Sequence, residues 1–152
     1  MFLGYVTEAE AGARSGWVAE EDGALAGYVT VRWPGVGTAD LAEIQDLNVL
    51  PRFRGRGIGA ELLERAEAAV AERFDRVQIA VGLHQGYGAA QRLYVRRGYL
   101  PDGRGASAGG RPVPEGSTVA LNDELVLTLQ KALRAGSAVV HDGDPGAGRA
   151  PE

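Results

Sequence analysis

The chain has 152 residues, 45% of them hydrophobic and 24% charged, and its formal net charge at pH 7 is −4. This length suits one domain with its own core, and the composition excludes wholesale disorder. The absence of cysteine excludes disulfides, a thiolate nucleophile and a cysteine zinc site. The acidic charge disfavours nucleic acid as a partner. Since no apolar stretch is long enough for a membrane span or typical of a signal peptide, we expect a cytoplasmic protein with no membrane partner.

The first predicted element in chain order is a β-hairpin. Residues 17–19 and 25–33 are rich in aromatic and β-branched side chains, and Asp22-Gly23 between them is typical of a two-residue turn. Residues 43–49 predict the next strand, because their character alternates and because Pro51 follows just beyond the end.

Helical spacing begins shortly after this strand. Apolar side chains recur every four residues from Ile58, which predicts an amphipathic helix ending near Arg73. Residues 77–81 alternate as another strand, and residues 89–97 read as a second helix with Gly98 as its C-terminal cap.

The last part of the chain is rich in glycine, proline and serine. Residues 101–118 predict a loop, and residues 125–129 predict a final strand. We expect residues 1–134 to form the domain and residues 135–152 a disordered tail. The order of elements predicts an α/β or α+β sheet with helices packed on it.

The turn before the first helix reads Arg54-Gly55-Arg56-Gly57-Ile58-Gly59. Glycine allows positive φ and close approach, so backbone N–H groups and the positive end of the helix can gather around an anion. The arginines add guanidinium donors suited to phosphate oxygens. The turn therefore predicts a pyrophosphate site.

Other interpretations of this turn are a tight connection without a ligand and a dinucleotide site. A mere connection would not need alternating arginines, and a P-loop is excluded because no Gly-Lys-Ser/Thr follows. Residues 55–60 fit the fingerprint G-x-G-x-x-G/A, with Asp75 about 20 residues further on, which keeps a nicotinamide-dependent oxidoreductase open. Against it, residues 51–54 separate the strand from the first glycine, and the chain is short for two mononucleotide-binding halves.

Two segments together resemble the GNAT superfamily of N-acetyltransferases. Residues 47–59 resemble its acetyl-CoA-binding motif Arg/Gln-x-x-Gly-x-Gly/Ala, whose fixed places are filled by Arg54, Gly57 and Gly59. Residues 90–99 look like the family's A-x-x-L-Y-x-x-x-G-F/Y helix. The resemblance covers roughly residues 17–131 and implies a GNAT-like fold with a mixed, mostly antiparallel central sheet and flanking helices.

The resemblance implies acetyl-CoA as co-substrate, held in a V-shaped split between the strands 43–49 and 77–81. The backbone of Leu47 and Val49 would pair with its amides. The turn would hold its pyrophosphate through Arg54, Gly55, Arg56, Gly57, Ile58 and Gly59. No metal is expected, because two histidines do not make a convincing metal site. The implied partners are acetyl-CoA and an amine acceptor, and a homodimer is compatible with the family.

By the same resemblance, Tyr94 occupies the position of the family's general acid. A tyrosine hydroxyl of pKa about 10 can donate to a departing thiolate whose conjugate acid has a pKa of about 8.5, although a packed aromatic is the alternative. Glu43 stands where some members carry the general base, and strict alternation places it on the same strand face as Val49. Asp46 and water are the other candidates for the base, and the plain alternative is that Glu43 is only an exposed carboxylate without a role. His84 is a further candidate, as a base or as a contact to the acceptor.

The chain departs from the family in two places. Tyr87 stands where members often carry an asparagine that contacts pantetheine, and only sixteen residues precede Trp17, where the family usually has a strand and one or two helices. We therefore expect a fold that lacks part of the N-terminal region, with an open acceptor site, help from a partner chain or reduced activity as the alternative consequences. The expected activity is direct transfer of an acetyl group to a primary amine of a small molecule or peptide. The alternatives are an acyl-CoA-binding module without turnover and the oxidoreductase.

Overall fold

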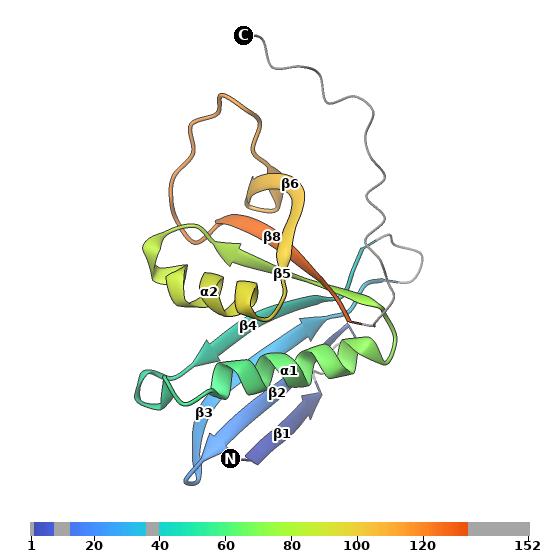
Figure 1. The fold of residues 1–152 in the computed structure, drawn as a ribbon, viewed down its shortest axis with the longest axis vertical. Coiled ribbons are helices and arrows are strands. Elements are labelled where there is room, and N and C mark those ends of the chain that lie inside the picture. Colours follow the sequence, from blue (N-terminus) through green and yellow to red (C-terminus); the bar gives the residue numbers. More distant parts are fainter. Residues whose placement is uncertain (1, 8–12, 36–39, 134–152) are drawn as a thin grey trace.

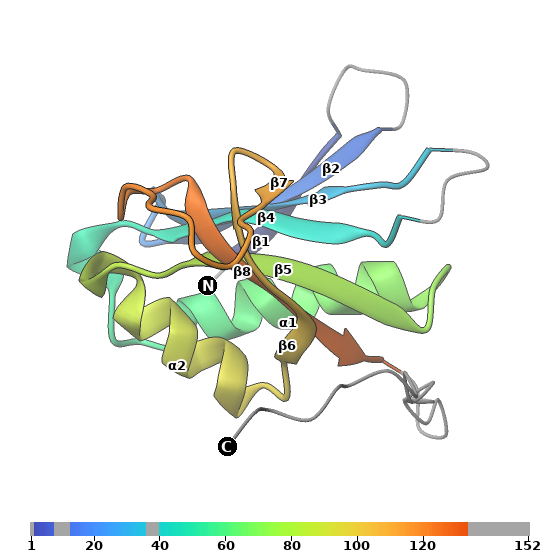
Figure 2. The same cartoon turned by 90° about the horizontal axis from the view of Figure 1, so that it is seen from above.

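A single mixed sheet organises the chain, and the computed structural model describes residues 2–7, 13–35 and 40–133 of it. Within these residues, eight strands lie in the order β1-β2-β3-β4-β5-β8-β6-β7, and two α-helices cover one face of the sheet (Figure 1, Figure 2). The predicted mixed, mostly antiparallel sheet with flanking helices is confirmed. No described helix has the length and apolar character needed to cross a membrane.

Four antiparallel strands make the N-terminal half of the sheet: β1 (Phe2–Thr7), β2 (Arg14–Glu21), β3 (Ala24–Arg32) and β4 (Glu43–Val49). The turn between β2 and β3 has φ angles of 53° at Asp22 and 74° at Gly23, as a two-residue hairpin turn requires, so the predicted hairpin is confirmed. β1 was not predicted, because its residues, FLGYVT, do not alternate between apolar and polar side chains.

A crossover connects the two halves of the sheet. β4 leads through the 3-10 turn Pro51–Phe53 into α1 (Ile58–Ala71), and then into β5 (Arg76–Gly82), which runs parallel to β4. These elements lie where the sequence predicts them. Because β4 and β5 are the only parallel pair among the described strands, the sheet lacks the two βαβαβ halves of a dinucleotide-binding fold.

The C-terminal half holds α2 (Gly88–Arg96), β6 (Leu100–Ala108), β7 (Arg111–Pro112) and β8 (Leu125–Ala132). The predicted loop over 101–118 is wrong in part, because β6 and β7 lie within it. Residues 102–105 of β6 lie opposite Thr128 alone, with positive φ at Gly103 and Gly105. This wide bulge removes the alternation by which a strand is recognised. The predicted tail 135–152 lies outside the described residues.

α1 supplies the centre of the core. Its apolar face is fully buried against the sheet, through Leu62, Leu63, Ala66 and Val70. Gly27 of β3 permits this close packing, since a Cβ there would lie 2.6 Å from the Asn48 carbonyl oxygen and 3.1 Å from Leu62 Cδ1. The helix that follows the glycine-rich turn is therefore packed closely on the sheet.

One carboxylate of α1 is buried with this apolar face. Glu67 is 7% exposed, and it accepts hydrogen bonds from Lys131 Nζ (2.8 Å), the Tyr99 hydroxyl (3.2 Å) and Arg97 Nη2 (3.4 Å). Burial, and then the charge of Glu67, raise the pKa of Tyr99. The cluster ties α1 to β8 and to the end of α2.

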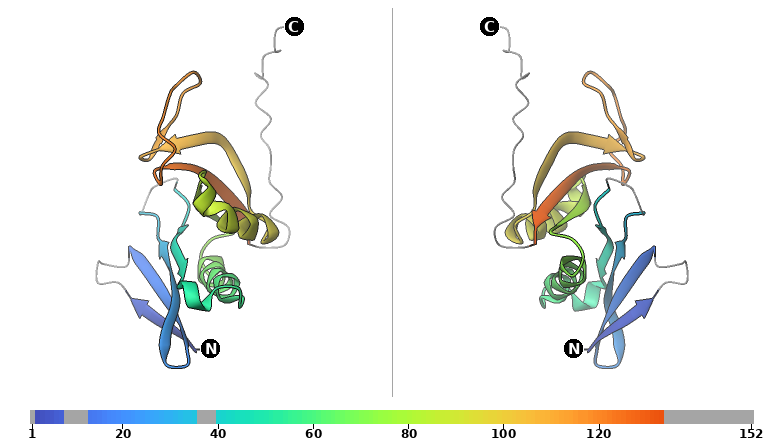
Figure 3. Two further views of the ribbon diagram at one scale, coloured as in Figure 1. Left: turned by 90° about the vertical axis from the view of Figure 1, so that its left-hand side faces the viewer. Right: turned by 90° about the vertical axis from the view of Figure 1, so that its right-hand side faces the viewer.

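The other face of the sheet has no described helix over it, as Figure 3 shows. Polar side chains lie in register across its centre, with Arg32 of β3, Glu43 of β4 and Gln78 of β5 on neighbouring strands. Arg32 and Gln78 both donate hydrogen bonds to Glu43. The open face of the sheet is therefore polar at β4 and β5, the two parallel strands.

Candidate active site

A split between β4 and β5 forms the centre of the candidate site. The two strands pair only at Glu43–Gln78 and Ile44–Ile79, and the Gln78 N–H donates to the Ala42 carbonyl oxygen at 3.1 Å. Beyond these residues the strands separate toward their C-terminal ends (Figure 1). Where the strands have separated, the backbone N–H and C=O groups that face the gap from β4 and β5 do not bond to each other. This is the geometry expected of a V-shaped split.

β4 carries a bulge at this split. Asp46 has a φ of 56°, and Asp46 and Leu47 together lie opposite the single residue Val29. The strict alternation predicted for the strand is consequently wrong beyond the bulge, because Val49 packs on the core side with Ile44 instead of sharing the face of Glu43. Leu47 also packs against the core. The residues predicted to bind through their backbone thus direct their side chains away from the open face.

The glycine-rich turn lies at the end of β4, where α1 begins. Gly55 and Gly57 have φ angles of 78° and 80°, and Gly57 accepts the Glu61 N–H at 3.1 Å as the first bond of the helix. Apart from the adjoining residues, no described atom lies within 4 Å of a Cβ built at Gly55 or Gly57, so the glycines serve the backbone conformation and leave open space. The first N–H groups of α1 have no intrahelical acceptor. The glycines of positive φ and the start of α1, two of the features from which the anion site was predicted, therefore lie together.

The two arginines of the turn make different contacts. The Arg54 Nε donates to the Val49 carbonyl oxygen at 2.9 Å, which braces the turn on the end of β4. Arg56 pairs with Glu21 at 3.1 Å and lies 5.6 Å from the centre of the Phe53 ring. Arg56 is therefore directed toward the β2–β3 hairpin, although half of its side chain is exposed.

A cleft of about 480 Å³ runs through the split and brings the two predicted catalytic residues, Glu43 and Tyr94, into one site. Tyr94 of α2 is 5% exposed, and its hydroxyl makes no hydrogen bond within the described residues. Burial, and then the neighbouring Tyr87, raise the pKa of Tyr94 to about 12. The hydroxyl is therefore protonated at neutral pH and can donate a hydrogen bond to a group in the cleft.

Glu43 is held by one of its oxygens. Its Oε2 accepts from Arg32 Nη2 at 2.9 Å and from Gln78 Nε2 at 3.5 Å, whereas Oε1 makes no hydrogen bond in the described structure. The second candidate base, Asp46, is engaged on one oxygen by the Thr30 hydroxyl at 2.8 Å and by Arg14 at 3.3 Å. Each carboxylate is thus anchored through one oxygen, but the Glu43 side chain is only 17% exposed whereas that of Asp46 is 53% exposed, so Glu43 is the better placed of the two in the cleft.

Tyr87, His84 and Asp123 form a hydrogen-bonded group beside the cleft that the sequence did not predict. His84 Nδ1 accepts the Gly86 N–H at 3.0 Å, so Nε2 carries the proton that it shares with Asp123 Oδ1 at 2.6 Å. Tyr87, which lines the cleft, packs directly over Gly82 and also bonds Asp123. Bonds from His84 and Tyr87 hold the pKa of Asp123 below its usual value. Asp123 lies far along the chain, and no motif indicated it.

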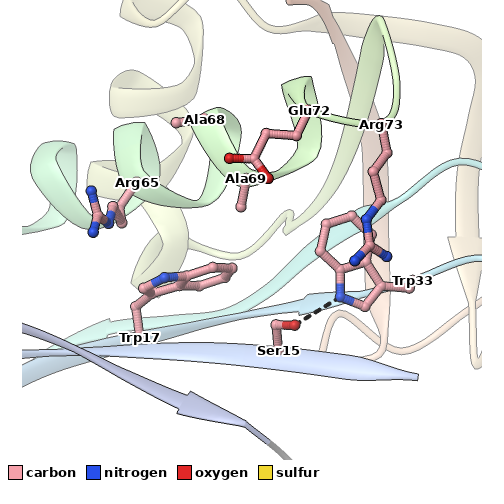
Figure 4. Close-up of a pocket in the computed structure, with 8 residues that line it drawn as sticks. All are labelled: Ser15, Trp17, Trp33, Arg65, Ala68, Ala69, Glu72 and Arg73. Carbon is pink, nitrogen blue, oxygen red and sulfur yellow. Dashed lines mark hydrogen bonds between the residues drawn. The ribbon is translucent and has the colours of Figure 1, made fainter. Parts of the chain in front are cut away.

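A second hollow lies away from this site, between α1 and the β2–β3 hairpin (Figure 4). It measures about 370 Å³ and contains none of the predicted site residues. The indole N–H of Trp33 donates to the Ser15 hydroxyl at 2.9 Å, and the Arg73 guanidinium lies 4.6 Å over the Trp33 ring. We attribute this hollow to the packing of the helix on the hairpin.

The fold is that of solved N-acetyltransferases. A nourseothricin acetyltransferase aligns with a TM-score of 0.62 and 24% identity over 80% of this chain and 66% of that one. An aminoglycoside 6′-N-acetyltransferase complexed with coenzyme A aligns with a TM-score of 0.61 and 16% identity over 81% of this chain and 74% of its own. At these identities the likeness concerns the fold alone.

Sequence similarity identifies the family of the chain. An uncharacterized N-acetyltransferase from Archaeoglobus fulgidus is 43% identical over 63 residues, which are 40% of this chain and 43% of that relative. The matched segment thus spans less than half of the curated relative. The model of the acetyltransferase (GNAT) family matches residues 3–99, and the chain belongs to this family.

Proposed function

We propose that the protein transfers an acetyl group from acetyl-CoA to a primary amine of a small molecule or peptide. The observation that carries the proposal is the cleft of about 480 Å³, whose lining includes Glu43, Tyr94 and residues from the separated edges of β4 and β5. The glycine-rich turn lies at the end of the same strand. A nicotinamide-dependent oxidoreductase is disfavoured, because the described sheet has one parallel pair and no second mononucleotide-binding half.

The residues of the split and the turn fit acetyl-CoA. The space at Gly55 and Gly57 is open, and the N-terminus of α1 offers donors and a favourable dipole to a pyrophosphate. The backbone edge of Leu47 and Val49 would take the amides of the pantetheine arm, as an added strand would. Acetyl-CoA supplies the acetyl thioester, and the protein supplies the positions of the reacting groups.

The chemistry requires one proton to leave the amine and one to reach the sulfur. Glu43 Oε1, directly or through water, receives the proton of the acceptor nitrogen as the C–N bond forms. The C–S bond breaks, the Tyr94 hydroxyl donates a hydrogen bond to the departing sulfur, and the thiolate takes its proton from water as the thiol leaves. A backbone N–H near Leu47 is the proposed donor to the carbonyl oxygen while it carries negative charge.

Calorimetric titration with acetyl-CoA, with NADH and NADPH as controls, tests the coenzyme, and a thiol-release assay with primary amines tests transfer. Gly57→Val should weaken acetyl-CoA binding at least tenfold, since a side chain with a φ of 80° costs about 1–2 kcal/mol and obstructs the phosphate site. Gly116→Val is the matched control, because Gly116 has a φ of 82° in a loop outside the cleft. Equal affinity in the two variants would overturn the pyrophosphate assignment. Binding without thiol release would favour the module without turnover.

A further inference from the structure

A third cavity adjoins the cleft on the open face of the sheet. It measures about 260 Å³ and shares Glu43, Ala80 and Val126 with the cleft. Ala80 and Thr128, which pair across β5 and β8, belong to its lining, and the bulge of β6 supplies the opposite wall. A molecule in this cavity therefore lies beside the carboxylate proposed as the base.

The bulge places an arginine in the lining of this cavity. Asp102 has a side chain that is only 2% exposed, and its two oxygens accept the Arg104 N–H at 2.9 Å and the Arg104 Nε at 2.8 Å. The Arg104 side chain is 73% exposed, and its Nη1 and Nη2 make no hydrogen bond within the described part of the chain. The buried carboxylate thus fixes one side of the guanidinium, while the terminal pair of donors stays available.

On the basis of the proposed function, we propose that the acceptor carries a carboxylate as well as the amine, and that Arg104 binds this carboxylate while Glu43 faces the amine. An arginine oriented through Nε presents its terminal nitrogens as a fork that matches a carboxylate. The volume of about 260 Å³ corresponds to about nine water molecules, which suits a molecule of amino-acid size. An acceptor with amines only would place a second cation near Arg104, and like charges repel.

Thiol release from acetyl-CoA, measured with a panel of L-amino acids, their primary amides and putrescine, tests this inference. The amides keep the amine and the side chain but lose the negative charge. We expect at least one amino acid to have a kcat/KM about 10- to 100-fold above that of its amide, the range of charge-assisted hydrogen bonds. Arg104→Gln should abolish this preference by lowering kcat/KM for the amino acid to about that of its amide, and Arg104→Lys should restore part of the preference.

Arg111→Gln is the matched control, because Arg111 is an exposed arginine of β7 outside the cavity lining. It should keep the preference for the amino acid. Equal rates for amino acids and amides, or a preference for putrescine, would overturn the inference while leaving acetyl transfer to amines intact. Absence of transfer to every acceptor would overturn it as well, and calorimetric binding of acetyl-CoA decides separately whether the proposed coenzyme site has failed.

Discussion

Replacement of Tyr94 by phenylalanine separates two ways in which its hydroxyl would assist departure of the thiolate. The first is complete transfer of the proton, and the second is donation of a hydrogen bond to the developing negative charge. The raised pKa of Tyr94, about 12 in the buried site, decides between them. The conjugate thiol of the leaving group has a pKa of about 8.5, so the tyrosine is the weaker acid by about 3.5 pKa units.

At about 1.36 kcal/mol per pKa unit, complete proton transfer to a fully formed thiolate is uphill by about 5 kcal/mol. A hydrogen bond to a charged group contributes about 1.5–3 kcal/mol without that cost. The hydrogen bond is therefore the favoured contribution. Tyr94→Phe should lower kcat by about 10- to 100-fold, below most of the range of about 10²- to 10⁴-fold that full general acid catalysis supplies.

The assay is thiol release at saturating acetyl-CoA and acceptor, with coenzyme affinity measured separately by calorimetry. The affinity should be unchanged, because phenylalanine keeps the ring. Tyr99→Phe is the control: its ring centre lies 5.9 Å from that of Tyr94, but its hydroxyl donates to Glu67. An unchanged kcat in Tyr94→Phe would remove Tyr94 from the mechanism, and a loss beyond about 10³-fold would refute the hydrogen-bond reasoning.

Three further predictions concern stability. Glu67→Ala should lower the free energy of unfolding by about 3 kcal/mol in urea titrations, because Lys131 and Arg97 lose their buried partner; a change below about 1 kcal/mol would contradict the structural role. Gly27→Val should cost about 1–3 kcal/mol by the same measurement, through collision with β4 and α1, and an unaffected midpoint would show that the backbone yields easily. The pKa of Tyr94 is about 12 in the folded protein and about 10 in the unfolded chain, so folding favours the neutral hydroxyl. The stability that this difference contributes is complete below about pH 10 and is lost between about pH 10 and 12. Tyr94→Phe should accordingly flatten the alkaline fall in melting temperature.

The elements with strong periods were predictable from the sequence. The strand 43–49, the first helix and the strand 77–81 are confirmed, because a buried face imposes alternation or a helical spacing on the residues that make it. β6 was missed for the opposite reason. Its bulge at residues 102–105 opens a cavity wall instead of filling a core, so no period marks it.

Side-chain placement at the site was less predictable than the elements. Asp46, with a φ of 56°, forms a bulge in β4 and reverses which face the following side chains lie on. The alternation of residue types in the sequence does not indicate this bulge. The contacts of Tyr87 and His84 with Asp123 depend on a tertiary approach across 36 and 39 residues, for which a single sequence carries no local signal. The motifs indicated Tyr94 and the glycine-rich turn as candidates, whereas Asp123 and the contacts of the candidate residues could be found only from the fold.

The split that opens the cleft also gives α1 a second role. β4 and β5 pair at only two positions, so their hydrogen bonds hold the two halves of the sheet together weakly. α1 compensates for this, because its apolar face packs against the sheet while Glu67 reaches Lys131 of β8 and the end of α2. The same helix begins at Gly57, in the proposed phosphate site. A phosphate group bound there would contact the element that joins the two halves, so coenzyme binding and the rigidity of the split are expected to be coupled.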